Sequence, residues 1–379
     1  MKYLKSYKTK EEYVNNVRGG GTTHHLPNVA LIEEDSKRPY YDVIRMSDNK
    51  LKNIWGRIKD KGWNHNTTSG ITTQELALIT SDEFNSLNEV EPTNMPGAMW
   101  KGLKTFDEFK YFTGVDNINA AKKSSSGNRI GGFNAAKDLE SITLPSSLKE
   151  IGDFAFNMIS HIGSTYYNDT KLKYVYGGEN VEKIGYVAFQ GCSALTEFNF
   201  SDKLTEIGTL AFRDCHSLTS VTMPNSVTSI GAEAFNECWN LEIVNGSNSF
   251  IGSTTTDITR LFYRCYKLKE LDLSNCDFSG IINYGLSYGA NSGLYLFVAE
   301  CSSLATLKLG KFNVSGFTNG TNYNLFDGDS SLKDIYITSD SPSLSFLESQ
   351  CVFSNIASNV TIHFGEELYT YNGSSWVKK

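Results

Sequence analysis

Apolar and polar positions recur along the chain with a period of 23 residues between Leu172 and Leu241. Three consecutive segments, VEKIGYVAFQGCSALTEF, LTEIGTLAFRDCHSLTSV and VTSIGAEAFNECWNLEIV, align without gaps. Such a period indicates an array of stacked units, because one short unit cannot bury its own apolar edge. We expect the shared positions to form a continuous core, and they are Ile184, Phe189, Cys192, Leu195, Ile207, Phe212, Cys215, Leu218, Ile230, Phe235, Cys238 and Leu241.

Each unit predicts two short strands joined by a turn. In Leu218–Met223, alternate residues would point inward from an extended chain. Pro224–Ser226 supplies turn residues, and Val227–Ile230 resumes the extended conformation. We expect Gly231 to permit the bend that follows. Units stacked at the ~4.8 Å spacing of neighbouring strands would give an array roughly 40 Å long.

Further copies extend the pattern in both directions. They give about eight or nine units between Val115 and Phe364. Insertions lengthen three coils, at residues 165–171, 247–259 and 279–295. The residues that we align with the repeat Phe in the other well-formed copies are Phe156, Phe262, Phe297 and Phe326.

The units share the pattern L-x-x-[VIF]-x-[LMF]-P-x-S-[VL]-x-x-I-G-x-x-A-F-x-x-C. This pattern resembles the BspA-like leucine-rich repeats of bacterial, Bacteroidetes-type surface proteins, over about two-thirds of the chain. The resemblance implies a β-rich, right-handed leucine-rich-repeat solenoid of about eight or nine coils over residues 105–364. A small mixed α/β domain would precede the solenoid at residues 1–104, and a C-terminal cap or tail would follow it at residues 365–379.

The first 104 residues do not repeat. Apolar spacing predicts a helix over residues 48–58. Residues 64–75 have the spacing of an EF-hand loop, but Asn and Thr stand where calcium ligands are usually acidic, so we interpret them as a relic loop without a cation. Residues 28–34 weakly resemble a leader found on proteins of gut Bacteroidetes and their phages. Residues 106–115 are expected to cap the open end of the core.

Composition and charge argue against several classes of partner. Apolar residues make up 40% of the chain and charged residues 20%, which is unlike a disordered protein. The formal net charge is -7 and no Lys or Arg run could track a phosphate backbone, so we expect neither nucleic acid nor an anionic membrane as partner. No apolar stretch approaches the ~18 residues of a transmembrane segment. Residues 1–8 are polar and contain no signal peptide; either the chain is not secreted or a signal was removed.

Five of the seven cysteines stand three residues before the repeat leucine, and Asp329 takes that position in a later unit. This regularity favours small apolar side chains in an interior column; a disulfide between neighbouring coils and a metal site stay open as alternatives. Cys276 aligns with Phe312 of a sister unit, so we expect an apolar site there too. Cys351 has no such alignment, and its role stays open.

No residue pattern indicates an active site. None of the six histidines has zinc-ligand spacing, and His216 occupies a variable surface position of the repeat. Gly19–Gly21 lacks the Lys-Ser/Thr of a phosphate-binding loop. We therefore expect a protein that is not an enzyme, with no catalytic residue, no metal and no cofactor. A catalytic site assembled across several coils is the minor alternative.

The outward positions of the first strand of each unit form two columns, and repeat arrays use such columns as extended binding faces. Tyr174, Tyr176 and Tyr336 are the preferred contacts, because exposed Tyr gives a large contact area at low entropic cost. A merely solvated face is the alternative. The candidate binding residues are Tyr174, Tyr176, Glu197, Asn199, Thr222, Asn245, Glu270, Asp272, Lys308 and Tyr336.

The family resemblance implies a non-enzymatic binding or adhesion module, extracellular or at the cell surface. Its partner would be a host or bacterial surface protein or a glycan, and its oligomeric state is left open. A first alternative is a structural or virion-associated protein of a Bacteroidetes phage or prophage, which the leader resemblance suggests. A second is an accessory of a carbohydrate-active enzyme, with the N-terminal residues as the functional part.

Overall fold

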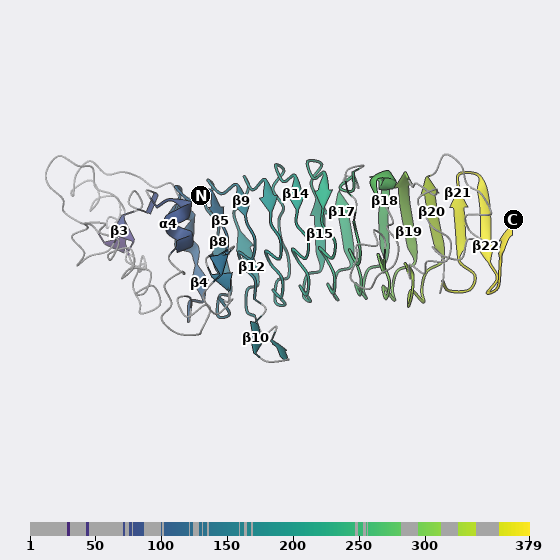
Figure 1. Cartoon of the computed structure of the whole chain (residues 1–379), viewed down its shortest axis with the longest axis horizontal. Helices are drawn as coiled ribbons and strands as arrows, with labels where there is room; N and C mark the ends of the chain where they lie inside the picture. The colour runs from purple at the N-terminus through teal and green to yellow at the C-terminus, as the bar shows by residue number, and fades with distance from the viewer. Residues whose placement is uncertain are drawn as a thin grey trace, which may run out of the picture.

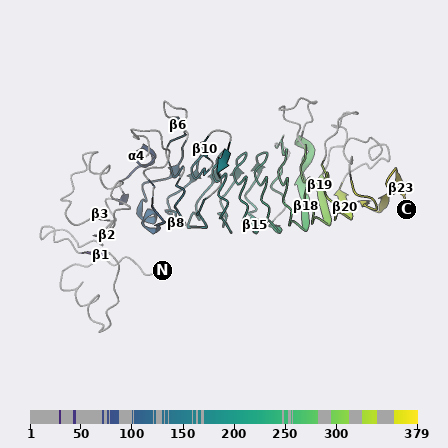
Figure 2. The same ribbon diagram turned by 90° about the horizontal axis from the view of Figure 1, so that it is seen from below.

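The computed structural model shows strands lying side by side along the long axis of the molecule (Figure 1). Figure 2 views the same stack from below. The residues that the structure describes are 102–120, 136–158, 170–246, 257–281, 295–311, 325–338 and 356–379, with shorter pieces at 29–30, 43–44, 71–72, 76–77, 79–86, 100, 122–123, 129–130, 132–134, 160–162, 165–167, 249–252 and 255. The predicted helix at residues 48–58 lies outside them, as does nearly all of the predicted EF-hand-like loop.

Two sets of strands run along the array. The main strands are β4 (Thr105–Phe106), β8 (Ser141–Thr143), β12 (Tyr174–Tyr176), β15 (Ser220–Met223), β17 (Ile243–Gly246), β18 (Glu270–Asp277), β19 (Thr306–Lys311), β20 (Asp334–Thr338) and β21 (Thr361–Phe364). The second strands are β5 (Asn117–Ile118), β9 (Glu150–Ile151), β13 (Lys183–Ile184), β14 (Glu206–Ile207) and β16 (Ser229–Ile230). Strands paired within each set are parallel, as stacked repeats require. The prediction of a parallel, β-rich repeat is therefore confirmed.

The remaining strands form antiparallel pairs. β10 (Ser160–Ile162) and β11 (Thr165–Tyr167) make a hairpin that projects from the array at an expected insertion (Figure 1). The other strands are β1 (Val29–Ala30), β2 (Val43–Ile44), β3 (Ile71–Thr72), β6 (Lys122–Lys123), β7 (Arg129–Ile130), β22 (Glu367–Tyr371) and β23 (Trp376–Lys378). Helix is scarce in the described part of the chain, where the named elements are α4 (Ser81–Ser86) and the 3-10 turns η2 (Asp107–Tyr111) and η3 (Phe278–Gly280).

Aromatic rings stack through the middle of the array. Consecutive rings from Phe133 to Phe262 lie 4.9–5.8 Å apart between centroids, with planes within 10° of parallel. Each stacked pair adds roughly 0.5–1.5 kcal/mol beyond the area it buries. The twelve shared core positions of the three ungapped units each expose at most 2% of their surface.

The repeat cysteines form a buried column beside these rings. Each thiol donates a hydrogen bond to a Phe carbonyl oxygen of the preceding coil, at sulfur–oxygen distances of 3.1–3.4 Å. For example, Cys215 Sγ donates to Phe189 O. Burial raises the pKa of all five thiols, so they stay protonated and able to donate. This bond between coils gives a physical reason for cysteine at that position.

The glycine after the repeat isoleucine has a different role from the one we expected. Its φ is not in the left-handed region at Gly185, Gly208 or Gly231, so the prediction that Gly231 permits a bend is wrong. Instead the neighbouring coil passes too close for a side chain. A Cβ at Gly231 would lie 2.3 Å from Thr209 N, and one at Gly208 would lie 2.6 Å from the carbonyl carbon of Gly185.

One coil is shifted by a residue from the predicted alignment. Phe212 N donates to Ala234 O, the residue before the next repeat Phe. By the same pattern Phe262 N donates to Phe297 O, which places Val298 at the Phe position. Phe297 therefore takes the Ala position, and its ring meets that of Phe262 edge-on at 67°. The alignment of Phe297 with the repeat Phe is wrong, because Cys301 follows it by four residues rather than three.

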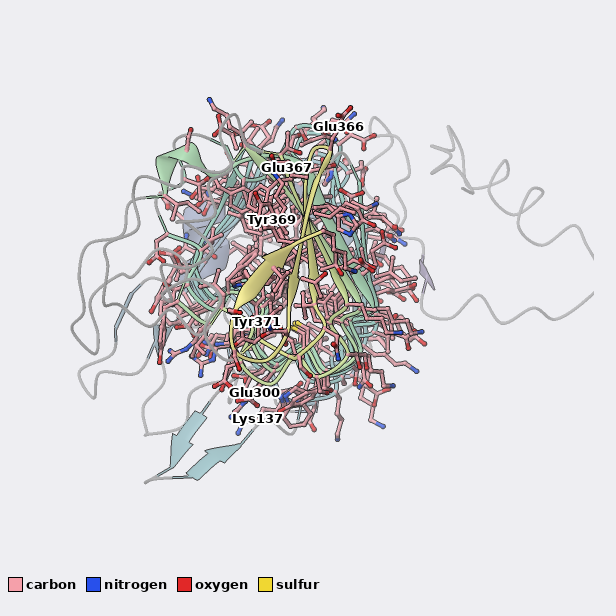
Figure 3. All side chains as sticks on the ribbon, turned by 90° about the vertical axis from the view of Figure 1, so that its right-hand side faces the viewer. Lys137, Glu300, Glu366, Glu367, Tyr369 and Tyr371 are labelled. Carbon is pink, nitrogen blue, oxygen red and sulfur yellow. The ribbon has the colours of Figure 1, made fainter. Side chains whose placement is uncertain are left out.

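Both ends of the core are covered by aromatic side chains. At the N-terminal end Phe84 of α4 packs on Phe109, 4.8 Å between ring centroids, and Trp100 packs on Phe133. These residues belong to the same buried cluster as the repeats. At the C-terminal end β22 and β23 extend the sheet beyond β21, with Tyr369 and Trp376 buried. Figure 3 looks onto this end and shows Glu367, Tyr369 and Tyr371 running across it.

The described part of the chain has no helix of the length and apolar character that a bilayer crossing requires.

Candidate functional site

The outward side of the main strands, which we call the strand face, contains the candidate binding residues. Along most main strands buried residues alternate with accessible ones, as in β12, where Val175 is buried between two tyrosines. Parallel pairing then sets outward residues of neighbouring coils beside one another. Pairs along one of the two columns include Tyr176 with Thr143, Thr222 with Asn245, and Lys308 with both Asp272 and Tyr336.

A pair of tyrosines stands near the N-terminal end of the strand face. The rings of Tyr174 and Tyr176 are stacked, with centroids 5.9 Å apart and planes at 16°. Lys173 Nζ lies 5.1 Å from the centroid of the Tyr174 ring, within range of a cation–π contact. Tyr176 exposes 49% of its surface. The small residues Ser141 and Thr143 lie beside these rings on β8. The two rings therefore form an accessible aromatic surface.

Charged residues occupy the strand face between β18 and β19. Lys308 Nζ lies 2.9 Å from Asp272 Oδ2 and 3.1 Å from Glu270 Oε1. Hydrogen bonds to both carboxylates raise the pKa of Lys308. Burial alone would raise the pKa of Asp272, but hydrogen bonds from Ser274 and Lys308 outweigh it and lower that pKa. The group contains two carboxylates and one ammonium, and so has one more acidic than basic side chain.

A second aromatic group follows on β20 and β21. Tyr336 stacks on His363 with centroids 4.1 Å apart, and His363 Nε2 lies 2.9 Å from Asp334 Oδ1. Sequence reasoning named Tyr336 and missed His363. The sequence position of His363 could have indicated it, because His363 continues the column of Asp272, Lys308 and Tyr336 in the last parallel strand.

The middle of the strand face is polar. Glu197, Asn199, Thr222 and Asn245 are all exposed. Glu197 and Asn199 lie in a segment without assigned strand, so the structure does not pair them with the neighbouring coils as it does the others. Ile243 exposes 49% of its surface here. The array thus brings aromatic, acidic and amide groups onto one face.

A second set of accessible residues lies along the turns that contain the column cysteines, which we call the turn edge. The position after the cysteine holds His216, Trp239 and Tyr266 in successive coils, and Trp239 and Tyr266 expose 40% and 37% of their surfaces. The rings of His216 and Trp239 are stacked at 3.7 Å between centroids. Sequence reasoning treated this column as ordinary surface.

Ion pairs connect coils along the turn edge. Arg264 bonds Glu300 through Nε at 3.0 Å and lies 3.3 Å from Glu237. Tyr263 Oη donates to Glu300 at 2.7 Å. Burial, followed by this hydrogen bond, raises the pKa of Tyr263 to about 12. The described residues contain one group of His and carboxylate side chains close enough to share a metal ion, Asp214, His216 and Glu237 of this edge.

Parallel strands, a repeated core and a thiol column define a leucine-rich-repeat protein. Residues 105–163 and 160–289 match the BspA type leucine rich repeat region, in six copies. The chain accordingly contains a BspA-type leucine-rich-repeat region over residues 105–289.

The chain is similar to solved structures of bacterial leucine-rich repeat proteins. A leucine-rich repeat protein from Bacteroides ovatus is 23% identical, with 65% of this chain and 68% of that chain covered at a TM-score of 0.33. A leucine rich cell surface protein from Faecalibacterium prausnitzii is 20% identical, with 65% and 72% covered and a TM-score of 0.32. A leucine-rich repeat protein from Eubacterium ventriosum is 19% identical, with 66% and 70% covered and a TM-score of 0.32. No curated protein matches the chain.

Proposed function

We propose that this chain is a non-enzymatic binding or adhesion module whose strand face engages a protein or a glycan at the bacterial surface. The observation that carries the proposal is the pair of stacked tyrosines on β12, with Tyr176 49% exposed. Exposed aromatic residues are enriched at the centres of interfaces because they bury large areas with few rotatable bonds. The BspA-type repeat region supports a binding role, since arrays of this kind present extended faces.

The shape of the array is part of the same proposal. We infer that the repeat region is a right-handed solenoid of about eight or nine coils, preceded by a small mixed α/β domain. Parallel pairing from β18 to β21 supports stacked coils, because it joins these main strands into one sheet. The proposed binding residues on these strands, Glu270, Asp272, Lys308 and Tyr336, are thus held in place before a partner arrives, which lowers the entropic cost of association.

The test is binding of the purified chain to an array of matrix proteins, mucins and glycans, with Tyr174→Ala/Tyr176→Ala as the variant. We expect saturable binding that the double variant weakens by at least about tenfold, or about 1.4 kcal/mol. Tyr186→Ala is the matched control, because Tyr186 is 42% exposed but follows a second strand, away from the strand face. Equal binding by the double variant, or no binding by the native chain, would contradict the proposal.

None of the described residues gives an observation that favours the virion-associated or enzyme-accessory alternatives.

A further inference from the structure

Three side chains of the turn edge converge from two neighbouring coils. Asp214 and Glu237 occupy the same repeat position, one residue before the column cysteine, and His216 follows Cys215. Asp214 N donates to Asn236 O at 2.9 Å, which holds the two turns together. One carboxylate oxygen of each acid and one ring nitrogen of His216 all lie within 4.8 Å of one another.

The His216 ring has an unused nitrogen at this point. Its Nε2 lies 3.9 Å from Asp214 Oδ1, which is too far for a hydrogen bond. The atom is buried and has no hydrogen-bond partner among the described residues. Stacking on Trp239 at 3.7 Å fixes the plane of the ring. Buried polar atoms nearly always have a hydrogen-bond partner, and a buried nitrogen without one is a candidate ligand for an ion.

Neighbouring cations compensate the two carboxylates only in part. Arg213 lies 3.6 Å from Asp214 but 3.0 Å from Glu233. Arg264 lies 3.3 Å from Glu237 but 3.0 Å from Glu300, so each arginine has a closer acid elsewhere.

Burial shifts the pKa of Asp214 and of His216. The Gln190 side chain also hydrogen-bonds Asp214, yet burial dominates and raises the pKa of Asp214 to about 6. Burial lowers the pKa of His216, so its imidazole is neutral at neutral pH and keeps a lone pair.

We propose that Asp214, His216 and Glu237 bind one divalent transition-metal ion, with zinc as the best fit. Imidazole nitrogen with two carboxylate oxygens suits zinc and its first-row neighbours, whereas magnesium and calcium favour all-oxygen sites. Tetrahedral zinc ligands lie about 3.4 Å apart at bond lengths near 2.05 Å. The present 3.9 Å between Nε2 and Oδ1 needs only a small side-chain movement to reach that separation.

The metal would tie two coils together and would keep a free coordination position. Three protein ligands leave the fourth position of a tetrahedral ion to water or to an atom from a partner. Trp239 and Tyr266 are exposed on the same column as His216, so a partner that reached the ion would also contact these rings.

The experiment is titration of the chelator-treated full chain with zinc chloride, followed by calorimetry. We expect the native chain to show one binding event, and His216→Gln and Glu237→Gln each to weaken its zinc affinity by at least about tenfold or to abolish it. A loss of about tenfold is already usual when a residue that only orients a metal ligand is replaced. His363→Gln is the matched control, because His363 also contacts an aspartate, at 2.9 Å, but has no third ligand among the described residues. Thermal unfolding verifies that each variant is folded.

A second readout locates the ion. Copper(II) bound at His216 should quench the Trp239 emission, and the quenched component should be missing in Trp239→Phe. The proposal is overturned if the native chain binds no zinc, or if the His216→Gln and Glu237→Gln variants bind it as the native chain does. Quenching that is unchanged in Trp239→Phe would also overturn it, because the copper would then sit elsewhere.

Discussion

The distance between coils is set at the repeat glycine. At Gly208 the neighbouring backbone passes so close that a Cβ would lie 2.6 Å from the carbonyl carbon and 2.7 Å from the oxygen of Gly185. Backbone atoms cannot rotate away as the end of a side chain can. Any larger residue would therefore push two coils apart and weaken the hydrogen bonds and ring contacts between them.

We expect Gly208→Ala to destabilise the protein by about 1–3 kcal/mol, the range found for overpacking. Gly252→Ala is the control, because its Cβ would meet only Thr228 O at 3.3 Å. Urea unfolding of both variants measures the difference in the free energy of unfolding. Equal free energies of unfolding for the two variants would show that glycine is not required at position 208 by the close approach of the neighbouring backbone.

Asp329 occupies the position that the column cysteine has in other coils. It is only 2% exposed. Its Oδ1 accepts a hydrogen bond from Cys301 N at 2.7 Å, whereas Oδ2 has no partner among the described residues. Burial raises the pKa of Asp329 to about 9. The folded protein therefore keeps this carboxyl protonated at neutral pH.

This raised pKa makes stability depend on pH. An unfolded aspartate loses its proton near pH 3.9, so between about pH 4 and 9 the folded state binds more protons at Asp329 than the unfolded state does. The contribution of Asp329 to the free energy of unfolding is thus largest below about pH 4, and it falls as pH rises towards 9.

We expect Asp329→Cys to stabilise the protein at pH 7 by about 1–3 kcal/mol, since it removes a buried unsatisfied oxygen. The stability gain over the native chain should be greater at pH 8 than at pH 5. Chemical unfolding at several pH values measures it. A gain that did not change with pH would mean that Asp329 titrates near its ordinary value.

The cysteine column is the element that most clearly links one coil to the next. Its thiols are buried, raised in pKa, and hydrogen-bonded to carbonyls of the preceding coil. Thiolate is the reactive form, and burial suppresses both its formation and its access to reagents.

We expect Cys192, Cys215, Cys238, Cys265 and Cys301 to resist iodoacetamide in the native protein and to react fully in urea. Peptide mass spectrometry after labelling distinguishes each site. Rapid labelling of any of these five in the native state would contradict the buried column.

The repeat element was largely predictable, because its period places each core residue without reference to distant parts of the chain. The role of Gly231 was not, since it depends on the backbone of the neighbouring coil. The coil at Phe297 was misaligned because Phe297 and Val298 are both large and apolar. The three-residue spacing to Cys301 and the hydrogen bonds between coils identify Val298 as the equivalent of the repeat Phe. His363 and the group around His216 likewise depend on which side chains the stacking brings together. The binding role of the strand face itself stays a prediction.

At the scale of the whole molecule, one buried cluster extends from Leu76 to Trp376 with aromatic residues over both ends. Among the described residues, the strand face and the turn edge are two accessible sides of different chemistry. The strand face has tyrosines and a slight excess of acid, whereas the turn edge has paired charges and the His216–Trp239–Tyr266 column. Figures 1 and 2 show how far the strands extend along the molecule.

The most direct test is hydroxyl-radical footprinting of the chain with and without a partner found on the binding array. Tyr176 and Tyr336 should be labelled in the free chain and protected in the complex, because both are accessible on the strand face. Tyr186, which is equally accessible elsewhere, should be labelled alike in both states. Protection of Tyr186 or of the turn edge, with Tyr176 and Tyr336 still labelled, would contradict the assignment of binding to the strand face.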